Sequence, residues 1–301
     1  MNQFVLLLLC LGAGALLQRV KAFPADASKG LNGFIIYLAL PAITLVYVPQ
    51  LEWSWQLLLP ALMSWIVFGL AWAGFHFLGK ILRWDRATTG CVVLCCGLGN
   101  TSFVGFPLIE HFYGKEGLAT AVLCDQPGAF LVLATLGMWV IGIYAGKETS
   151  LRSIGRRIAA FPPFIAFLVA VVLSLSNLDI PSFLLFSLER IGATLAPLAL
   201  VSVGLQLRRP PASFPAVPFS LGLVYKLGIA PAVIALLYMS LLGQRGTAIE
   251  ITVLEAAMAP MITPAILAAE NNLNPPLAAL FVGIGIPLSL LTVWVWFHFL
   301  I

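Results

Sequence analysis

Long apolar stretches follow one another from one end of this chain to the other. Each runs for roughly 17 to 25 residues or a little more, and as an α-helix that length covers the about 30 Å of hydrocarbon in a bilayer. Between them stand short polar segments, of which the longest is Gly146 to Ala159. We therefore predict ten membrane-spanning helices, at residues 2–18, 31–49, 55–79, 87–112, 117–145, 160–176, 183–207, 215–242, 247–270 and 276–299.

The first apolar stretch could also be read as a secretory signal peptide. A signal peptide carries positive charge before its apolar core. Here no basic residue precedes the stretch, whereas Arg19, Lys21 and Lys29 follow it. We interpret residues 2–18 as the first spanning helix.

Prolines recur at a nearly constant spacing in the two halves of the chain. Pro41, Pro60, Pro107 and Pro127 are followed 156 to 160 residues later by Pro197, Pro218, Pro264 and Pro287. Chance matching among the 20 prolines is the alternative to a duplication. The spacing predicts a first repeat at residues 1–146, a linker at 147–159 and a second repeat at 160–301. Because five helices is an odd number, the second repeat enters the membrane from the opposite side and is inverted.

Lysine and arginine gather in alternate loops. Because cytoplasmic loops carry an excess of these residues, we predict a cytoplasmic central linker and outward-facing termini, in the plasma membrane or a bacterial inner membrane. The even-numbered loops hold only Lys115 and Arg245, and Arg190 lies near the start of the seventh helix. The odd-numbered loops hold Arg19, Lys21, Lys29, Lys80, Arg83, Arg86, Lys147, Arg152, Arg156, Arg157, Arg208 and Arg209.

The composition excludes a soluble domain and several kinds of chemistry. Hydrophobic residues make up 61% of the chain, charged residues 9%, and the mean hydropathy is +1.02. The net charge of +4 follows from loops that face anionic lipid headgroups and requires no nucleic-acid partner. Cys91, Cys95 and Cys96 have no histidine near them in sequence, so we expect packing rather than a zinc site. No glycine-rich phosphate loop follows a strand, so we expect no use of ATP.

Two predicted helices carry proline at matching places in the two halves. A proline opens backbone groups that hydrocarbon tolerates only beside protein or a water-filled cavity, and half-helix N-termini suit a carboxylate. In the alternative, the polar side chains only satisfy the kinked backbone. We predict a substrate site at these breaks, formed by Gly99, Asn100, Thr101, Ser102, Pro107, Pro260, Thr263 and Pro264.

Three ionisable residues fall well inside predicted helices at similar depth. Asp125, Lys226 and Glu255 would be costly to bury, and such residues usually mark a transport pathway or a charged pair. Two carboxylates and one ammonium leave a negative charge that a sodium ion or a proton would neutralise, so we predict a role in ion coupling. The alternatives are structural: Lys226 could pair with one acid or reach the cytoplasmic face, and Asp125 could stabilise the kink beside Pro127.

The sequence resembles the auxin efflux carrier family of membrane transporters along its whole length. The similarity is strongest in Gly99 to Leu108, in Ala196 to Leu205 and in Ala257 to Pro260 with Pro264. The resemblance implies an all-α fold of ten helices in two inverted repeats, related to sodium/proton antiporters and bile acid/sodium symporters. It also implies that helices four and nine unwind where they cross, that helices one, two, six and seven form a scaffold, and that small organic anions are carried.

The ninth helix departs from the family pattern, in which the proline directly follows the methionine. Here Ala259 stands between Met258 and Pro260, which leaves the break point open. In addition, Glu255 to Met258 is similar to the segment of bile acid/sodium symporters whose glutamate binds sodium, and Asn100 stands where those symporters have a sodium-binding asparagine. This second resemblance implies a sodium site formed by Glu255, Asn100 and Thr101.

These observations favour a secondary transporter of small organic anions that works by alternating access. A non-transporting membrane sensor is the alternative, although no output domain is evident in the sequence. An intramembrane enzyme using Asp125 and Glu255 as acid and base is a third class, but Lys226 beside them would favour two ionised carboxylates. Dimerisation is left open, and no cofactor is expected beyond a coupling ion.

Overall fold

The computed structural model describes residues 2–24, 26–52, 54–146, 150–176, 178–207 and 215–300. Lys147, Arg208 and Arg209 of the predicted basic loops lie outside these ranges. Within them the regular secondary structure is helical, and β-type pairing is confined to one isolated bridge between Gly99 and Pro260.

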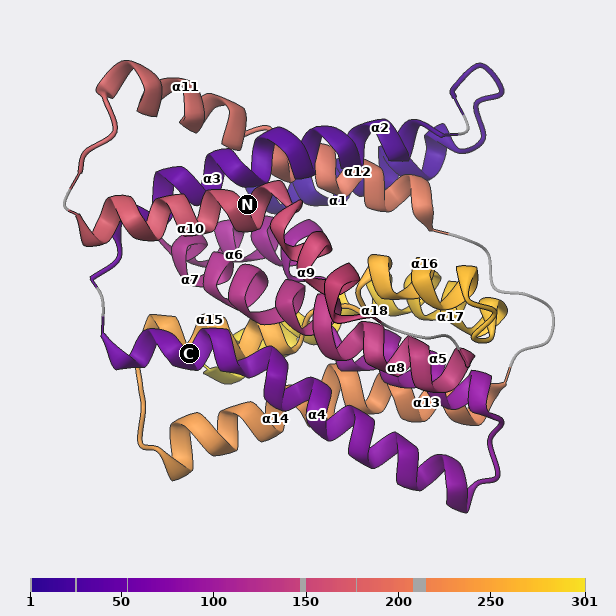
Figure 1. Cartoon of the computed structure of the whole chain (residues 1–301). Helices are drawn as coiled ribbons and strands as arrows, with labels where there is room; N and C mark the ends of the chain where they lie inside the picture. Colours follow the sequence, from indigo (N-terminus) through magenta and orange to yellow (C-terminus); the bar gives the residue numbers. More distant parts are fainter. Residues whose placement is uncertain are drawn as a thin grey trace.

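The helices follow the predicted order along the chain (Figure 1). Their bounds are α1 Asn2–Leu17, α2 Ala27–Phe34, η1 Ile35–Ala39, α3 Leu40–Tyr47, η2 Val48–Gln50, η3 Trp55–Leu57, α4 Leu58–Ile81, α5 Arg86–Gly97, η4 Thr101–Gly105, α6 Phe106–Tyr113, α7 Gly117–Leu123, η5 Cys124–Phe130, η6 Leu133–Gly137, α8 Met138–Ala145, α9 Leu151–Ala159, α10 Pro162–Leu175, α11 Ser182–Gly192, α12 Leu195–Gln206, α13 Ala216–Val224, η7 Tyr225–Ile229, α14 Ala230–Ala235, η8 Leu236–Leu241, α15 Thr247–Ala256, α16 Ile262–Glu270, α17 Pro275–Gly283 and α18 Gly285–Leu300.

Five continuous helices among the described residues are long and apolar enough to cross a membrane. They are Ala27–Gln50, Trp55–Ile81, Gly117–Ala145, Ser182–Gln206 and Ala216–Leu241. The number rises to seven if α9 with α10, bent by 67°, and α17 with α18, bent by 41°, each count as one span. The predicted ranges 87–112 and 247–270 are each divided into shorter helices. The described residues thus confirm a helical protein with helices long and apolar enough to span a membrane, and ten helices in two inverted repeats stay a prediction.

Three prolines within the long continuous helices lie in or just after π-helical segments. η1 is a π-helical segment just before Pro41, η5 is one that contains Pro127, and η7 is one just before Pro231. A proline has no N–H to donate and its ring clashes with the carbonyl four residues earlier, so the widened turn of a π-helix accommodates it. Of the prolines from which we predicted a duplication, Pro41 and Pro127 therefore lie next to or within π-helical segments, and the duplication stays a prediction.

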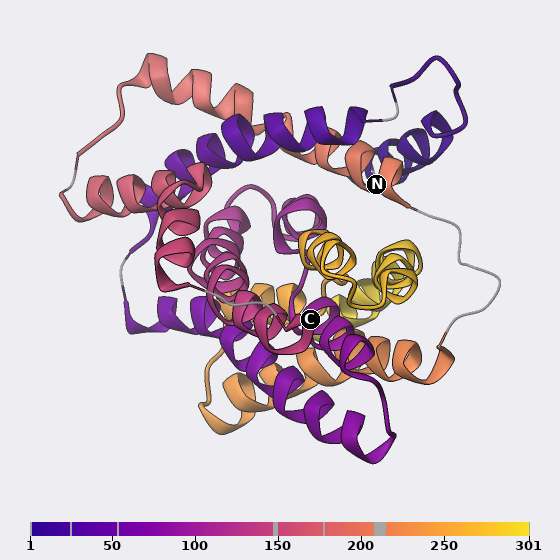
Figure 2. The ribbon, with the colours of Figure 1, turned by 45° about the vertical axis from the view of Figure 1, so that its right-hand side comes forward.

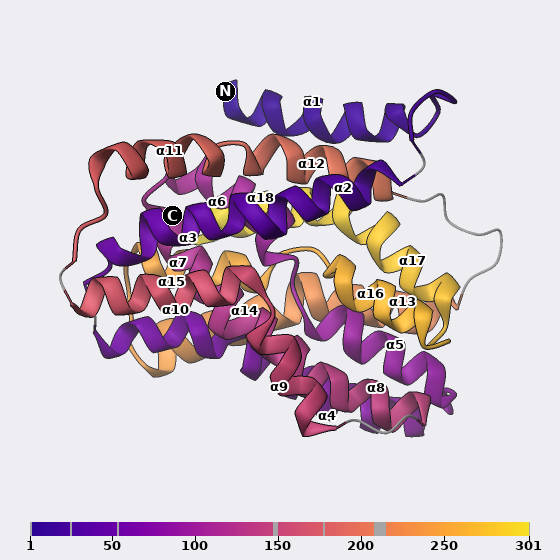
Figure 3. The same cartoon turned by 45° about the horizontal axis from the view of Figure 1, so that its top comes forward.

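The helices form two bundles, seen from three directions in Figures 1, 2 and 3. The first bundle consists of α1, α2 with α3, α10, and α11 with α12, which pack against one another. The second bundle contains α4 to α8 and α13 to α18, packed around α5 and α15. Contacts between the bundles run mainly through η4, α6, α7 and η5. The first bundle holds the same segments that the family resemblance assigns to a scaffold.

Loops at the two ends of the molecule alternate along the chain. The last residues of α1 and α4 lie at one end, on the right in Figure 1, whereas those of α3, α10 and η8 lie at the other. The basic residues Arg19, Lys21 and Arg83 follow α1 and α4. This arrangement agrees with the alternation of loop charge, and the outward orientation of the termini stays a prediction.

The segment expected as a linker contains a helix of its own, α9. Ser150 caps it by accepting a hydrogen bond from the N–H of Arg152 at 3.3 Å. Ile154 is buried, whereas Arg152 and Arg156 are exposed. The apolar side of α9 therefore faces the protein and its basic side faces outward.

Apolar side chains cover much of the outside of the molecule, whereas three ionisable ones lie deep inside it. Phe299 is 75% exposed and Leu291 67%, whereas Asp125, Lys226 and Glu255 are 3%, 1% and 0% exposed. Such a distribution suits a protein whose surroundings are hydrocarbon.

Two glycines allow α1 and α12 to approach closely in the first bundle. A Cβ on either Gly14 or Gly204 would lie 2.9 Å from the Cα of the other. Close approach through small residues is a common way for membrane helices to associate. The side-chain amide of Gln18 adds hydrogen bonds to the carbonyls of Gly204 and Leu207, at 2.7 and 2.8 Å.

We expect Gly204→Leu to separate α1 from α12 and to destabilise the protein by about 1–3 kcal/mol, the usual cost of forcing a large side chain into a packed contact. Thermal unfolding of the purified protein in detergent measures the effect. Gly12→Leu is the matched control, because nothing lies within 4 Å of a Cβ at Gly12 on the same helix α1. Equal melting temperatures for the two variants would contradict the role of the glycine contact.

Candidate functional site

The two broken helices cross, and their unwound residues pair with each other. The carbonyl of Leu98 accepts a hydrogen bond from the N–H of Met261 at 3.1 Å, and the N–H of Asn100 donates to the carbonyl of Ala259 at 2.8 Å. The backbone groups of each unwound segment thus find hydrogen-bond partners in the other segment, away from water. The break that the sequence left open lies between the end of α15 at Ala256 and the start of α16 at Ile262.

Asn100 ends the first break and caps the helix that follows. Its side-chain Oδ1 accepts a hydrogen bond from the N–H of Phe103 at 3.2 Å, and its carbonyl accepts one from the N–H of Gly105 at 2.9 Å. The amide nitrogen Nδ2 is buried and has no hydrogen-bond partner. A buried donor without an acceptor is costly, so this nitrogen is available to a ligand that carries an acceptor.

Asp125 is held by three side chains from two helices. Its Oδ1 accepts hydrogen bonds from the hydroxyls of Thr101 and Ser102, each at 2.5 Å, and its Oδ2 accepts one from Nε2 of Gln126 at 2.6 Å. The two hydroxyls that we predicted to bind substrate therefore bind Asp125. Gln126 was missed by the sequence analysis, although it stands next to Asp125 in the chain, and its Oε1 is buried without a partner.

Lys226 and Glu255 reach the same crossing. The Lys226 ammonium donates to the carbonyl of Ala256 at 2.7 Å. Both carboxylate oxygens of Glu255 are buried with no hydrogen-bond partner. Gly105 leaves the space that this carboxylate fills, since a Cβ there would lie 2.7 Å from Oε1. Glu255 is therefore a buried acceptor whose partner the protein does not supply.

The structure gathers most of the predicted site residues but not all of them. Gly99, Asn100 and Pro260 lie at the crossing itself, where Gly99 and Pro260 form the isolated bridge. Pro107 is buried in the first turn of α6 and Pro264 in the first turn of α16. Thr263 is exposed, so its side chain does not join the buried cluster.

The predicted sodium ligands make other contacts. The hydroxyl of Thr101 donates to Asp125, and Oδ1 of Asn100 is used as a helix cap. Among the residues that the structure describes, no group of three or more His, Cys, Asp or Glu side chains could hold a metal ion. Cys91, Cys95, Cys96 and Cys124 are buried free thiols. Of the residues expected to hold sodium, Glu255 is the one whose side-chain oxygens have no hydrogen-bond partner, and the sodium site stays a prediction.

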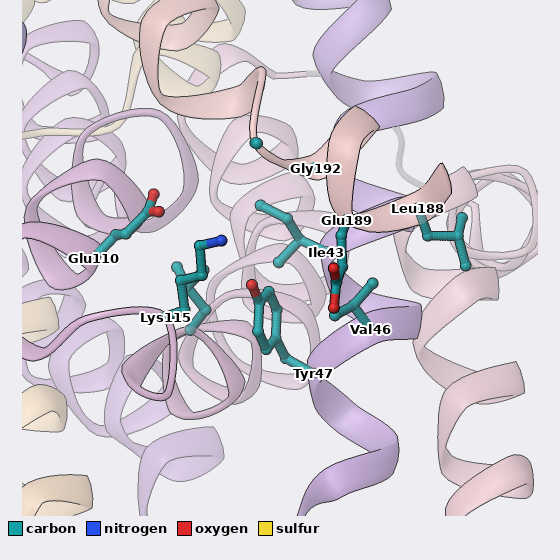
Figure 4. Close-up of a pocket in the computed structure, with 10 residues that line it drawn as sticks. Ile43, Val46, Tyr47, Glu110, Lys115, Leu188, Glu189 and Gly192 are labelled. Atoms are coloured by element: carbon teal, nitrogen blue, oxygen red, sulfur yellow. The ribbon is translucent and has the colours of Figure 1, made fainter. Parts of the chain in front are cut away.

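A separate pocket opens where the two bundles meet (Figure 4). Glu110 and Lys115, from the α6–α7 region, lie on one side of it. Tyr47 of α3 and Glu189 of α11 lie on the other side. The sequence analysis did not single out Tyr47 or Glu189. Charged groups of both bundles thus face one another at this end of the boundary.

We expect Asp125→Ala to destabilise the protein by about 1–3 kcal/mol, because it leaves the buried donors of Thr101, Ser102 and Gln126 without an acceptor. Asp125→Asn keeps an oxygen for the two hydroxyls and should fall between the wild type and Asp125→Ala. Thermal unfolding of the three purified proteins gives the order of their stabilities. A wild-type melting temperature for Asp125→Ala would show that the hydrogen bonds to Asp125 contribute nothing to the fold.

Comparison with known proteins places this crossing in a transporter. The family described as "Membrane transport protein" matches residues 1–149 and 147–297. An uncharacterized transporter of Methanocaldococcus jannaschii is 29% identical over 278 residues, 90% of this chain and 89% of the relative. A second, from Methanothermobacter thermautotrophicus, is 27% identical over 94% of this chain and 92% of the relative.

A third relative has a name that includes a substrate. A protein of Rhizobium meliloti named "Putative malonate transporter" is 26% identical over 66% of this chain and 63% of its own length. The two family matches together cover nearly all of the sequence, which confirms the resemblance drawn from the motifs around Asn100 and Pro260. The chain belongs to the membrane transport protein family of the auxin efflux carriers and is an integral membrane protein.

Proposed function

We propose that this protein is a secondary transporter that carries small organic anions, such as carboxylates, through a site at the crossing of the two broken helices. It would reside in the plasma membrane, or in the inner membrane of a bacterium, with ten spanning helices in two inverted repeats and both termini outside. The family supports transport as such. The site and its substrate class rest on the geometry of the crossing.

The observation that carries the proposal is the unpartnered amide nitrogen of Asn100 beside the broken backbone. This nitrogen is buried, donates to nothing in the protein and stands at the start of a helix. A carboxylate suits it, since anions are favoured near helix N-termini. The relative named for malonate makes a dicarboxylate the natural first substrate to test.

Alternating access would use the division into two bundles. The crossing belongs to the second bundle, and η4, which follows Asn100, contacts α12 of the first. Movement of one bundle against the other would expose the site to each side of the membrane in turn, as in other transporters with broken helices. The pocket of Figure 4 opens at the boundary where such a movement would occur.

Ion coupling would act through the three buried charges. If Asp125, Lys226 and Glu255 are all ionised, the crossing carries one excess negative charge in surroundings with little water, which is costly unless it is balanced. A proton or a sodium ion would neutralise that charge. The energy for transport would then come from an ion gradient.

Uptake of radiolabelled malonate by proteoliposomes tests this function. Sodium and proton gradients are imposed separately, with protein-free liposomes as the baseline. We expect accumulation that depends on the protein and on one imposed gradient. Protein-independent flux for malonate and for a panel of other small carboxylates would refute the proposal.

A further inference from the structure

We infer that Lys226 is a tethered cation whose ammonium occupies the place of an inorganic cation at the broken end of α15, so that the protein neither binds nor requires sodium at the crossing. This inference rests on the proposed function only where it states that transport needs no sodium. The position of the Lys226 ammonium is a property of the folded protein and can be tested without any substrate.

The first observation is the place where the ammonium ends. Lys226 lies in the π-helical segment η7, is 1% exposed and donates to the carbonyl of Ala256, the last residue of α15, at 2.7 Å. The carbonyl end of a helix carries a partial negative charge that favours a cation. The side chain therefore does not extend to the membrane surface, as a lysine on a spanning helix often does, but ends at the crossing.

Room for the ammonium comes from the other break. A Cβ on Gly99 would lie 3.0 Å from Nζ of Lys226 and 3.2 Å from the carbonyl oxygen of Glu255. The ammonium thus lies between the two unwound segments, with carbonyl oxygens of α15 on one side and Gly99 on the other. Carbonyl oxygens around a buried position are the surroundings in which transporters hold a coupling ion.

The charges at the crossing show which acid lacks a partner. Asp125 receives three hydrogen bonds, whereas neither oxygen of Glu255 receives any. Glu255 belongs to the same final turn of α15 as Ala256, whose carbonyl binds the ammonium. Lys226 therefore places a positive charge at the carbonyl of Ala256. A sodium ion at that position would meet like charge, which leaves the excess negative charge of the crossing to a proton.

The matching end in the first half of the chain is apolar. A Cβ on Gly97, the last residue of α5, would lie 2.7 Å from the ring of Phe68 on α4, which is fully buried. Phe68 precedes Lys226 by 158 positions, within the spacing of the repeated prolines. Phe68 thus packs at the end of α5, whereas Lys226 binds the end of α15. An ammonium is therefore not required wherever a broken helix ends.

Thermal unfolding of the purified protein in sodium chloride and in choline chloride of equal concentration tests the inference. We expect the wild type to melt within about 1 °C in the two salts, because no sodium-specific binding adds to its stability. In Lys226→Ala, sodium can enter the vacated place beside Glu255 and should raise the melting temperature by about 3 °C or more over choline. Lys80→Ala, which removes an exposed lysine at the end of α4, should behave as the wild type.

Two results would overturn the inference. One is a sodium-specific rise in the melting temperature of the wild type, and the other is the same melting temperature for Lys226→Ala in both salts. If Lys226→Ala does not fold, Lys226→Met is compared with Lys226→Met combined with Glu255→Gln. Recovery of folded protein in the double variant supports a balance between the charges of Lys226 and Glu255. Failure to recover folded protein refutes that balance.

Malonate uptake separates this inference from the proposed function. Flux that persists when choline replaces sodium supports both the transport function and the role of Lys226 as a tethered cation. Flux that requires sodium supports transport and overturns the tethered cation. Absence of carboxylate flux, together with the expected melting temperatures, refutes the transport proposal and leaves the assignment of Lys226 standing.

Discussion

Replacing Glu255 by glutamine should reduce carboxylate uptake by at least about tenfold, which corresponds to about 1.4 kcal/mol in the rate-limiting barrier, without lowering the melting temperature. Neither carboxylate oxygen of Glu255 receives a hydrogen bond in the folded protein, so the substitution breaks none. A buried carboxylate without donors is a burden on stability rather than a contribution to it, and after its removal Asp125 still balances the charge of Lys226. Its place at the crossing is explained if its charge is used during transport.

The matched control is Glu250→Gln, which removes the same charge from the same helix α15. Glu250 accepts a hydrogen bond from the Tyr113 hydroxyl at 3.2 Å near the beginning of that helix and lies outside the crossing. Initial uptake rates in proteoliposomes and thermal unfolding in detergent are measured for both variants. Glu250→Gln should retain uptake, and wild-type uptake by Glu255→Gln would show that the buried carboxylate has no part in transport.

The positions of the helices could be predicted closely from the sequence because hydrocarbon imposes a simple rule. A segment that crosses it must be apolar and about 20 residues long, and charge falls in the loops. The range predicted at residues 117–145 coincides with the continuous helix Gly117–Ala145. The helix α9 was not foreseen, because its nine residues carry three arginines and resemble a loop in composition.

The breaks were predictable and the side-chain partners were not. Proline and glycine identify where a helix must open, which placed the crossing near Asn100 and Pro260. The hydrogen bonds from Thr101 and Ser102 to Asp125 join residues 24 and 23 positions apart, and they depend on how two helices pack. Periodicity within one helix carries no information on that packing, so the hydroxyls were assigned to substrate instead.

Depth along a helix proved informative for the charged residues, but only as a first step. The predicted common depth of Asp125, Lys226 and Glu255 agrees with their burial around one crossing. It did not distinguish Asp125, which has three donors, from Glu255, which has none. That difference separates a structural carboxylate from a candidate for coupling, and it appears only in the packed structure.

Replacing Asn100 by alanine should weaken carboxylate binding by about 10- to 150-fold, because a hydrogen bond to a charged group contributes about 1.5–3 kcal/mol. The substitution also removes the cap that Oδ1 provides to the N–H of Phe103, and loss of such a cap costs about 0.5–2 kcal/mol of stability. Binding and stability would therefore fall together in Asn100→Ala, and this variant alone could not separate the two roles.

Asn100→Asp separates them because aspartate keeps the capping oxygen and replaces the donor Nδ2 with a second acceptor. Its carboxylate would repel an anion while still accepting from the N–H of Phe103. We expect Asn100→Asp to lose carboxylate binding at least as completely as Asn100→Ala, with a cap that still forms. Affinity is measured by calorimetry with malonate on monodisperse protein, and helix content by circular dichroism. Wild-type affinity in folded Asn100→Asp would mean that the side chain of Asn100 serves only the kinked backbone. The anion would then bind elsewhere at the crossing.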